Sequence, residues 1–502
     1  MQVTGSRSAS GTVVTAFLAM AATYVTLSSF EFVLVDMQTD LGFSTDDANS
    51  LNYMPAAASL LVVFVAGSLA DRWGPRRMLL IAATLFTAGA VMVGLAPGTT
   101  WVVLGRILDG VGGVTMAIVG LSVINATVTE PARRARVFGI YAATTPAVFM
   151  LAPPVSALIV ESAGWRAGVI PWVILGCLLL LATWRFVPAR GSLGGGELAT
   201  PLLAGLVLAG IAIGVTSLPT NRDFAVVAGV IAVISLTILV IALRRMTSPT
   251  LDLGWCRGRG MIILLVALAV TSMPNLFFYT NLMLQYRYSV PLVLIALLLI
   301  VPQACAVAGG LLSGPVSARI GPQRAAAAAL AVSALASLGT LIVTPQSPIW
   351  VPVLALALSA APIAFVVGPI TDTLLSRAPA GASGTASSVR KATWTLGGVL
   401  GGALVGALSF GAFQSRLTEV LEADGVGFAE AELLAREIRD GAVVDHLAAR
   451  LSDPIAREAL ISQGPALVEA QSYSFVVMGT VSAIVYAVAT VLMLVYMRRV
   501  RA

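Results

Sequence analysis

Apolar stretches long enough to cross a membrane, about 20 residues each, recur along this 502-residue chain and constrain its fold more than any other feature. Residues 261–283, for example, contain no charged side chain. Only 11% of the chain is charged, whereas a soluble domain carries about 25%. Helices satisfy their own backbone hydrogen bonds in lipid, and the runs are continuous rather than alternating. The sequence predicts an all-α polytopic membrane protein.

Fourteen spans can be placed, arranged as six, two and six. Residues 1–190 form a six-helix bundle, 191–258 form two inserted transmembrane helices, and 259–502 form a second six-helix bundle. The second bundle includes an extracytoplasmic acidic helical loop at 413–472. The predicted spans are 12–35, 51–70, 78–97, 101–124, 137–160, 166–187, 200–218, 224–243, 260–283, 291–314, 325–345, 350–374, 393–412 and 473–497.

Charge sets the orientation. With a cytoplasmic N-terminus, the 30 basic residues divide twenty-one to eight in favour of the cytoplasmic loops, and Arg106 remains within a span. Basic loops on one side orient membrane proteins, so this bias does not indicate a nucleic-acid partner. We expect both termini to be cytoplasmic, the acidic loop to be outside, and the protein to lie in the cell membrane.

Catalytic chemistry finds no support in the sequence. The chain has one histidine and three cysteines, and these are too few and too scattered for a metal site, a disulfide framework or a Ser-His-Asp triad. There is also no phosphate-binding loop. We therefore expect a protein that is not an enzyme and needs no cofactor.

Two loops repeat one pattern. GSLADRWGPRR at Gly67–Arg77 returns 247 residues later as GPVSARIGPQR at Gly314–Arg324, and a Gly, an Arg, a Gly, a Pro and an Arg recur in register. Transporters often consist of repeated halves. The two six-helix bundles are therefore predicted to be parallel repeats. Asp71 of the first copy is Ala318 in the second.

These motifs resemble the major facilitator superfamily, in its fourteen-helix branch of drug–proton antiporters. Gly67–Arg77 is similar to the superfamily's loop 2–3 signature, and residues 102–112, with Arg106 and Asp109, are similar to its fourth-span signature. Gly164-Trp165-Arg166 and Leu284-Gln285 also fit the branch. The resemblance implies a cytoplasmic gate in which Asp71 clasps the two halves while the cavity faces outward; the alternative is a helix cap beside Arg72. The implied gate residues are Gly67, Asp71, Arg72, Gly74 and Arg77.

Two departures bear on the mechanism. The antiporter signature G-x-x-x-G-P-x-x-G-G of span 5 keeps its proline as Pro153, but Ala152, Ser156 and Ala157 replace glycines. In span 1 the branch's aspartate falls at Thr26 and its asparagine at Glu31. The first departure weakens the assignment of antiport. The second implies that ion or substrate coupling has moved along the span.

Ionisable residues inside a membrane are costly and tend to act in function. Glu31, Arg106 and Asp109 fall in the outer halves of spans 1 and 4, and we expect one proton-coupling cluster. The alternatives are a solvated Glu31 and a purely structural Arg106–Asp109 pair. Tyr24 shares the face of Glu31. Asp372, which ends span 12, is expected at a solvated end rather than in a gate. Candidate substrate contacts in the second half are Asn275, Gln285 and Gln303.

The leading hypothesis is a secondary transporter that exports amphipathic or cationic small molecules by alternating access, with the proton gradient as its energy source. The alternatives are a lipid or glycolipid exporter or flippase that uses the outer loop, a proton symporter for organic acids or sugars, and a sensor that keeps the fold without transport. The expected partners are the substrate, protons and the bilayer. We expect a monomer, with an envelope partner possible at the outer loop.

Overall fold

A computed structural model gives the architecture of residues 4–42, 45–189, 197–218, 222–246, 251, 253–286, 288, 290–379, 381–423, 425–439 and 464–501. This part of the chain is helical and contains no strand, which confirms the predicted all-α class. Its helices are α1 (Thr4–Leu41), α2 (Thr45–Trp73), α3 (Pro75–Gly94), α4 (Thr99–Thr127), α5 (Pro131–Ala163), α6 (Trp165–Gly168), α7 (Ile170–Phe186), α8 (Ala199–Ser217), α9 (Arg222–Arg245), the 3-10 helix η1 (Gly254–Arg257), α10 (Arg259–Thr271), α11 (Leu276–Tyr286), α12 (Leu292–Leu298), α13 (Ile300–Ile320), α14 (Pro322–Ser337), the 3-10 helix η2 (Leu338–Ile342), α15 (Trp350–Leu375), α16 (Ser383–Ala423), α17 (Phe428–Arg439) and α20 (Gly464–Arg501).

Among the described residues, thirteen helices are long and apolar enough to cross a membrane. The fourteenth crossing, predicted as one continuous span at 260–283, is instead two short helices, α10 and α11. The chain leaves helical geometry between Ser272 and Asn275. Pro274 lies in this break, and proline removes a helical hydrogen bond and clashes with the preceding turn. The prediction of a continuous helix was therefore wrong, although the number of crossings agrees with the fourteen predicted.

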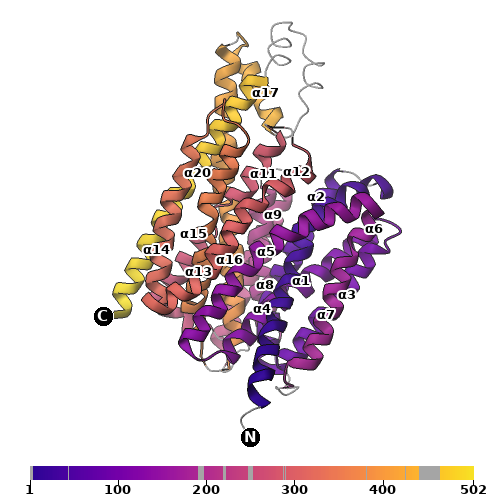
Figure 1. Cartoon of the computed structure of the whole chain (residues 1–502), viewed down its shortest axis with the longest axis vertical. Helices are drawn as coiled ribbons and strands as arrows, with labels where there is room; N and C mark the ends of the chain where they lie inside the picture. Colours follow the sequence, from indigo (N-terminus) through magenta and orange to yellow (C-terminus); the bar gives the residue numbers. More distant parts are fainter. Residues whose placement is uncertain are drawn as a thin grey trace.

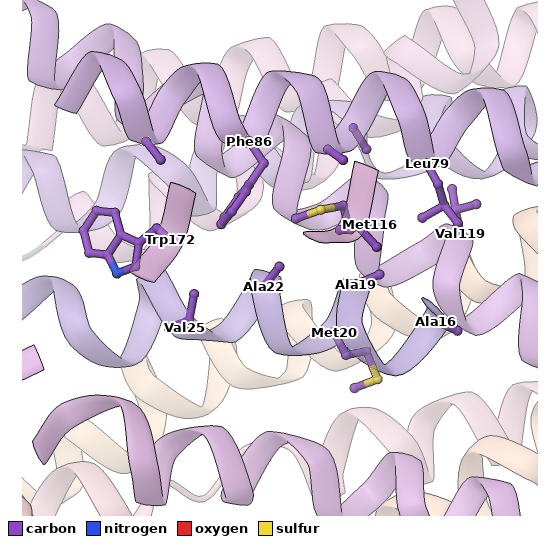
Figure 2. Close-up of a cluster of buried hydrophobic side chains, with 14 of the residues drawn as sticks. Ala16, Ala19, Met20, Ala22, Val25, Leu79, Phe86, Met116, Val119 and Trp172 are labelled. Atoms are coloured by element: carbon purple, nitrogen blue, oxygen red, sulfur yellow. The ribbon is translucent and has the colours of Figure 1, made fainter. Parts of the chain in front are cut away.

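The two six-helix bundles lie side by side, purple and orange in Figure 1, and both chain ends lie away from α17. The core of the first bundle is built where α1, α3, α4 and α7 meet (Figure 2). Trp172 and Phe86 are fully buried there against small residues of α1 such as Ala19 and Ala22. Small side chains let transmembrane helices approach closely, so packing rather than hydrophobicity stabilises this bundle.

The repeated loops have the same backbone geometry. Gly74 ends α2 with φ 84° and ψ 153°, and Gly321 ends α13 with φ 86° and ψ 146°. A positive φ strains any residue that has a Cβ, so glycine is required at both turns. Pro75 and Pro322 then open α3 and α14 at the first helical position, where proline is favoured. The repeat in sequence is thus a repeat in structure.

The inserted pair lies against the first bundle. At Gly205, α8 approaches α2 so closely that an added Cβ would collide with the carbonyl of Leu61. Helix α9 packs on α8 and leaves large apolar side chains uncovered, including Val226 and Val233, which are 61% and 64% exposed. Such a surface suits lipid rather than water.

At the outer end, two helices extend beyond the predicted spans. Helix α16 has 41 residues and α20 has 38, whereas about 20 suffice to cross a bilayer. The amphipathic α17 packs on these extensions through Leu434, which lies in a small core with Leu417 and Leu421. The predicted loop at 413–472 therefore begins and ends as continuous helix. Its central part, residues 440–463, lies outside the described residues.

Candidate substrate cavity and cytoplasmic gate

A cavity of about 350 Å³ lies between the two halves, beside the break that separates α10 from α11. Both halves contribute to its wall, which combines aromatic, aliphatic and a few polar side chains. Those used in the argument below are Tyr24, Tyr141, Phe149, Asn275, Phe277, Gln303, Arg390 and Trp394.

Three predicted contact residues line this cavity. Tyr24 projects from α1, Asn275 lies in the break before α11, and Gln303 projects from α13. The break positions Asn275, because it brings irregular backbone to the cavity wall, where such backbone is tolerated in membranes. Gln285 lies in α11, and its side chain is outside the described part of the chain.

An aromatic row crosses the cavity between the halves. The ring centroids of Tyr24 and Phe149 are 6.4 Å apart, and those of Phe149 and Phe277 are 5.9 Å apart in an edge-to-face arrangement. Aromatic pairs at these separations attract each other beyond the effect of burial alone. The row offers an apolar, flat contact surface to a bound molecule.

One cation lines the cavity and a second lies next to one of its wall residues, and the sequence alone singled out neither. Arg390 lines it and is only 5% exposed, and its Nε donates a hydrogen bond of 3.1 Å to the Thr371 hydroxyl. Its guanidinium lies 5.3 Å from the Tyr141 ring centroid. The Nζ of Lys391 lies 5.9 Å from the ring centroid of Tyr24.

Arg390 and Lys391 precede the predicted span 393–412 and belong to the twenty-one basic residues assigned above to cytoplasmic loops, and for these two that assignment was wrong. Helix α16 begins at Ser383, not at 393, so Arg390 and Lys391 lie within the helix. Without these two, the predicted cytoplasmic side has nineteen basic residues against eight, so the orientation remains the one that loop charge predicts. Hydropathy placed the start of this helix too late because Ser383–Ser388 consists of small and mostly polar residues. Such residues nevertheless pack well between membrane helices.

Arg106 and Asp109 form a buried ion pair inside the first bundle. Nη1 of Arg106 lies 2.6 Å from a carboxylate oxygen of Asp109, and the two residues are 2% and 6% exposed. The Thr26 hydroxyl donates to the other carboxylate oxygen at 3.1 Å, and the guanidinium lies 3.8 Å from the Phe30 ring centroid. The pair joins α4 to α1 and does not line the cavity.

Glu31 is not part of that pair, so the prediction of one three-residue cluster was wrong. Thr26 and Phe30, one turn apart, face α4, whereas Glu31 is turned about 100° from Phe30. It shares a face of α1 with Tyr24 and Leu27 and is exposed. Along the helix it lies about 10 Å beyond Tyr24 toward the outside. Among the described residues, Glu31 makes no ion pair.

Asp71 connects the two halves at their cytoplasmic ends. Its carboxylate accepts hydrogen bonds from the backbone N–H of Gly384 at 2.6 Å, and from the N–H and hydroxyl of Thr385 at 2.8 and 2.9 Å. These donors belong to the first turn of α16, where the helix dipole favours negative charge. Asp71 of α2 thus caps a helix of the opposite half.

The rest of the repeated motif surrounds this contact. A Cβ added to Gly67 would collide with the Gly384 carbonyl and the Ser388 hydroxyl, so glycine is needed for the close approach of α2 and α16. Gly74 makes the turn into α3, and Arg77 is exposed. Arg72, next to Asp71, is half-buried.

A second contact closes the other side of the cytoplasmic end. A Cβ added to Gly139 of α5 would approach the Gly314 nitrogen to 2.8 Å, so α5 and α13 meet as α2 and α16 do. Ala318 has no carboxylate, and here Arg134 pairs with Asp372 of α15 at 2.5 Å instead. Asp372 is 8% exposed, so its expected position at a solvated helix end was wrong. Together the two contacts join the halves at the end of the molecule where the repeated loops lie.

The altered motif of span 5 serves helix packing. Helix α5 continues through Pro153 and Pro154 without a break, with Pro153, Ser156 and Ala157 buried and Ala152 half-buried. None of these four residues lines the described cavity wall. Within the described part of the chain, no three His, Cys, Asp or Glu side chains come together as a metal site would require.

Two repeated helical halves with a cavity between them are the architecture of a membrane transporter. The family model described as Major Facilitator Superfamily matches residues 14–402. This chain belongs to that superfamily.

Its relatives in sequence include drug-resistance proteins. The chain is 27% identical over 430 residues to "Multidrug resistance protein Stp" of Mycobacterium tuberculosis (strain CDC 1551 / Oshkosh), covering 82% of this chain and 77% of that one. It is 30% identical over 410 residues to "Puromycin resistance protein pur8" of Streptomyces alboniger, covering 77% and 79%. It is 25% identical over 383 residues to "Tetracenomycin C resistance and export protein" of Streptomyces glaucescens, covering 74% and 70%.

Solved structures share the fold at low identity. The human organic anion transporter MFSD10 (TETRAN) superposes with a TM-score of 0.57 at 12% identity, covering 97% of this chain and 99% of the other. The proton:xylose symporter XylE superposes with a TM-score of 0.53 at 17% identity, covering 96% and 95%. These likenesses support the all-helical transporter architecture.

Proposed function

We propose that this protein exports amphipathic small molecules across the cell membrane in exchange for protons. The central observation is the cavity between two repeated halves, which Asp71 and the Arg134–Asp372 pair join at the end that the loop charges predict to be cytoplasmic. Opening that side and closing the other would expose the same cavity to the cytoplasm. The names of relatives in the superfamily, which refer to drug resistance and export, support the outward direction.

The cavity favours amphipathic over cationic substrates. Its described wall contains an arginine and no carboxylate, so a cation would meet repulsion rather than a counter-charge. Its volume of about 350 Å³ is typical of a pocket for a drug-sized molecule. A lipid with two acyl chains would not fit inside, which argues against the flippase alternative.

Glu31 is the carboxylate that we propose carries the proton. It lies on the same face of α1 as Tyr24, which lines the cavity, and about 10 Å farther toward the outside, where protons would arrive while the cytoplasmic side is closed. The charge of Asp109, by contrast, is already balanced by Arg106 at 2.6 Å. No cofactor is needed, because a proton that moves inward releases about 2.3 kcal/mol per 100 mV of membrane potential.

Proton flux in liposomes tests this proposal. Purified protein is reconstituted with a pH-sensitive dye inside, an acid-outside gradient is imposed, and aromatic anions, neutral compounds and cations are added separately. We expect substrate-triggered proton flux that is lost in Glu31→Gln and kept in Asp36→Asn, which removes an exposed carboxylate from the same helix. Proton flux that survives in Glu31→Gln but is lost in Asp109→Asn would assign the proton site to Asp109 instead of Glu31. Absence of flux with every class would refute coupled transport.

A further inference from the structure

The two cations beside the cavity have neutral neighbours. The Thr371 hydroxyl accepts a hydrogen bond from the Nε–H of Arg390, one of the five N–H donors of its guanidinium. Tyr141 and Trp394 present aromatic rings to Arg390, and Tyr24 presents its ring to Lys391. Over the described residues, neither cation lies within ion-pair distance of a carboxylate.

A buried cation without a counter-charge is costly, and folding alone does not require one at this place. Arg390 is only 5% exposed, and burial of an unpaired charge destabilises a protein strongly. Arg390 contacts Thr371, and the residue after Thr371 is the acid Asp372. The carboxylate of Asp372 is already paired with Arg134. The structure therefore retains a positive charge that its own carboxylates do not neutralise.

The geometry suits a planar acid with an aromatic body. Arginine presents parallel N–H groups that match a carboxylate in a two-point contact, and Lys391, the next residue of α16, adds a second positive charge on the side of α1. The aromatic row of Tyr24, Phe149 and Phe277 lies on the same cavity. An acid group at the cations would leave its ring system against these side chains.

We propose that the substrates of this transporter are amphipathic carboxylic acids, whose carboxylate binds between Arg390 and Lys391. This inference rests on the proposed export function and specifies its substrate class. This proposal places the residues that hold the substrate on α16, and Asp71 caps the first turn of the same helix. Substrate binding and the proposed gate therefore involve one helix.

Matched probes with one ring system test the charge preference. Calorimetric titration of the purified full-length protein would compare 1-naphthaleneacetate, 1-naphthaleneacetamide and (1-naphthylmethyl)trimethylammonium. We expect the acid to bind about tenfold tighter than the amide, as for a charge-assisted pair in place of a neutral one. Arg390→Gln and Lys391→Gln should each reduce this preference of the acid over the amide. Arg319→Gln, which removes an exposed cytoplasmic arginine, should change neither.

Each result of these titrations either supports or refutes the carboxylic-acid proposal. Equal binding of the three probes, a preference for the ammonium, or a preference that survives both substitutions would overturn the inference. If Arg390→Gln does not fold, the parent preference, Lys391→Gln and the charge-keeping Arg390→Lys still decide. Proton flux triggered by the amide but not by the acid would agree with the proposed export and would refute carboxylic acids as the substrate class. Acid binding that needs both cations, without flux for any probe, would support this site and refute export.

Discussion

Replacement of Asp71 by asparagine should open the cytoplasmic side of the molecule. The carboxylate accepts three hydrogen bonds from the first turn of α16. Each carboxylate oxygen accepts one backbone N–H, so asparagine keeps one such acceptor and turns an amide N–H₂ toward the other backbone N–H. A hydrogen bond to a charged group contributes about 1.5–3 kcal/mol, and the charge at a helix N-terminus contributes about 0.3–1 kcal/mol more.

One lost charged hydrogen bond and the lost charge together give about 3 kcal/mol against the closed state. A coupling of this size corresponds to a shift of about 150-fold in the equilibrium between cytoplasm-closed and cytoplasm-open conformations. The shift should be specific to this carboxylate. Glu130, an exposed acid on the same side whose side chain caps no helix, supplies the matched control as Glu130→Gln.

Electron–electron distance measurement can detect the shift. Spin labels at Arg77→Cys and Arg324→Cys, the exposed ends of the two repeated loops, report the separation of the halves in lipid nanodiscs. We expect Asp71→Asn to move the population toward longer distances, and Glu130→Gln to match the parent. Unchanged distances together with a lower melting temperature would refute the gating role and reduce Asp71 to a helix cap.

Three further results are expected. Gly67→Val should exclude the cytoplasm-closed state, because the valine side chain would collide with the start of α16. The same spin labels should then report longer distances. The control Gly229→Val, whose side chain would lie in open space, should transport like the parent. The Arg166 guanidinium, with the Trp165 indole, lowers the pKa of the Asp40 carboxyl, so the contribution of this contact is complete above the unfolded pKa of about 3.9 and is lost as the pH falls through the lower folded value. The melting-temperature difference between the parent and Asp40→Asn should therefore be constant at neutral pH and vanish in strong acid; a difference that persists there would contradict the pairing. Arg416→Gln, which breaks a half-exposed bridge between α16 and α20, should lower the free energy of unfolding by less than about 1 kcal/mol, and a larger loss on thermal melting would show that the outer extension supports the whole bundle.

The sequence predicted the architecture because its signals are local. Hydropathy marks each crossing, loop charge orients them, and the glycines of the repeated loops are required by turns at Gly74 and Gly321. The same local signals could not show that Pro274 splits a crossing, since proline inside a membrane helix often only bends it. The break becomes apparent only through its neighbours: added Cβ atoms at Gly397 and Gly401 of α16 would collide with the backbone around it.

The site was harder to predict because it depends on which face of each helix a residue occupies and on which residues of other helices it contacts. Glu31 and Asp109 lie at similar depth, and depth alone suggested one cluster, yet the rotation of α1 turns Thr26 toward Asp109 and Glu31 away from it. Arg390 was counted as a loop charge because the helix start before it is polar. The role proposed for Arg390 depends on the residues that surround it in space, and no spacing along the chain records these.

The sign of the charge in the cavity also determines how the membrane potential drives export. A proton that moves inward and a monoanion that moves outward both run down an inside-negative potential, so a one-for-one exchange contributes about 4.6 kcal/mol per 100 mV, twice the value for a single charge. The same exchange with a monocation is electrically silent. Cations at the substrate anchor thus allow the potential to act on both steps without contact between the two sites. The proposed mechanism agrees with the separation of the two sites: Glu31 lies about 10 Å from Tyr24 toward the outside, whereas Arg390 lines the cavity and Lys391 lies beside Tyr24, both on the helix whose first turn Asp71 caps.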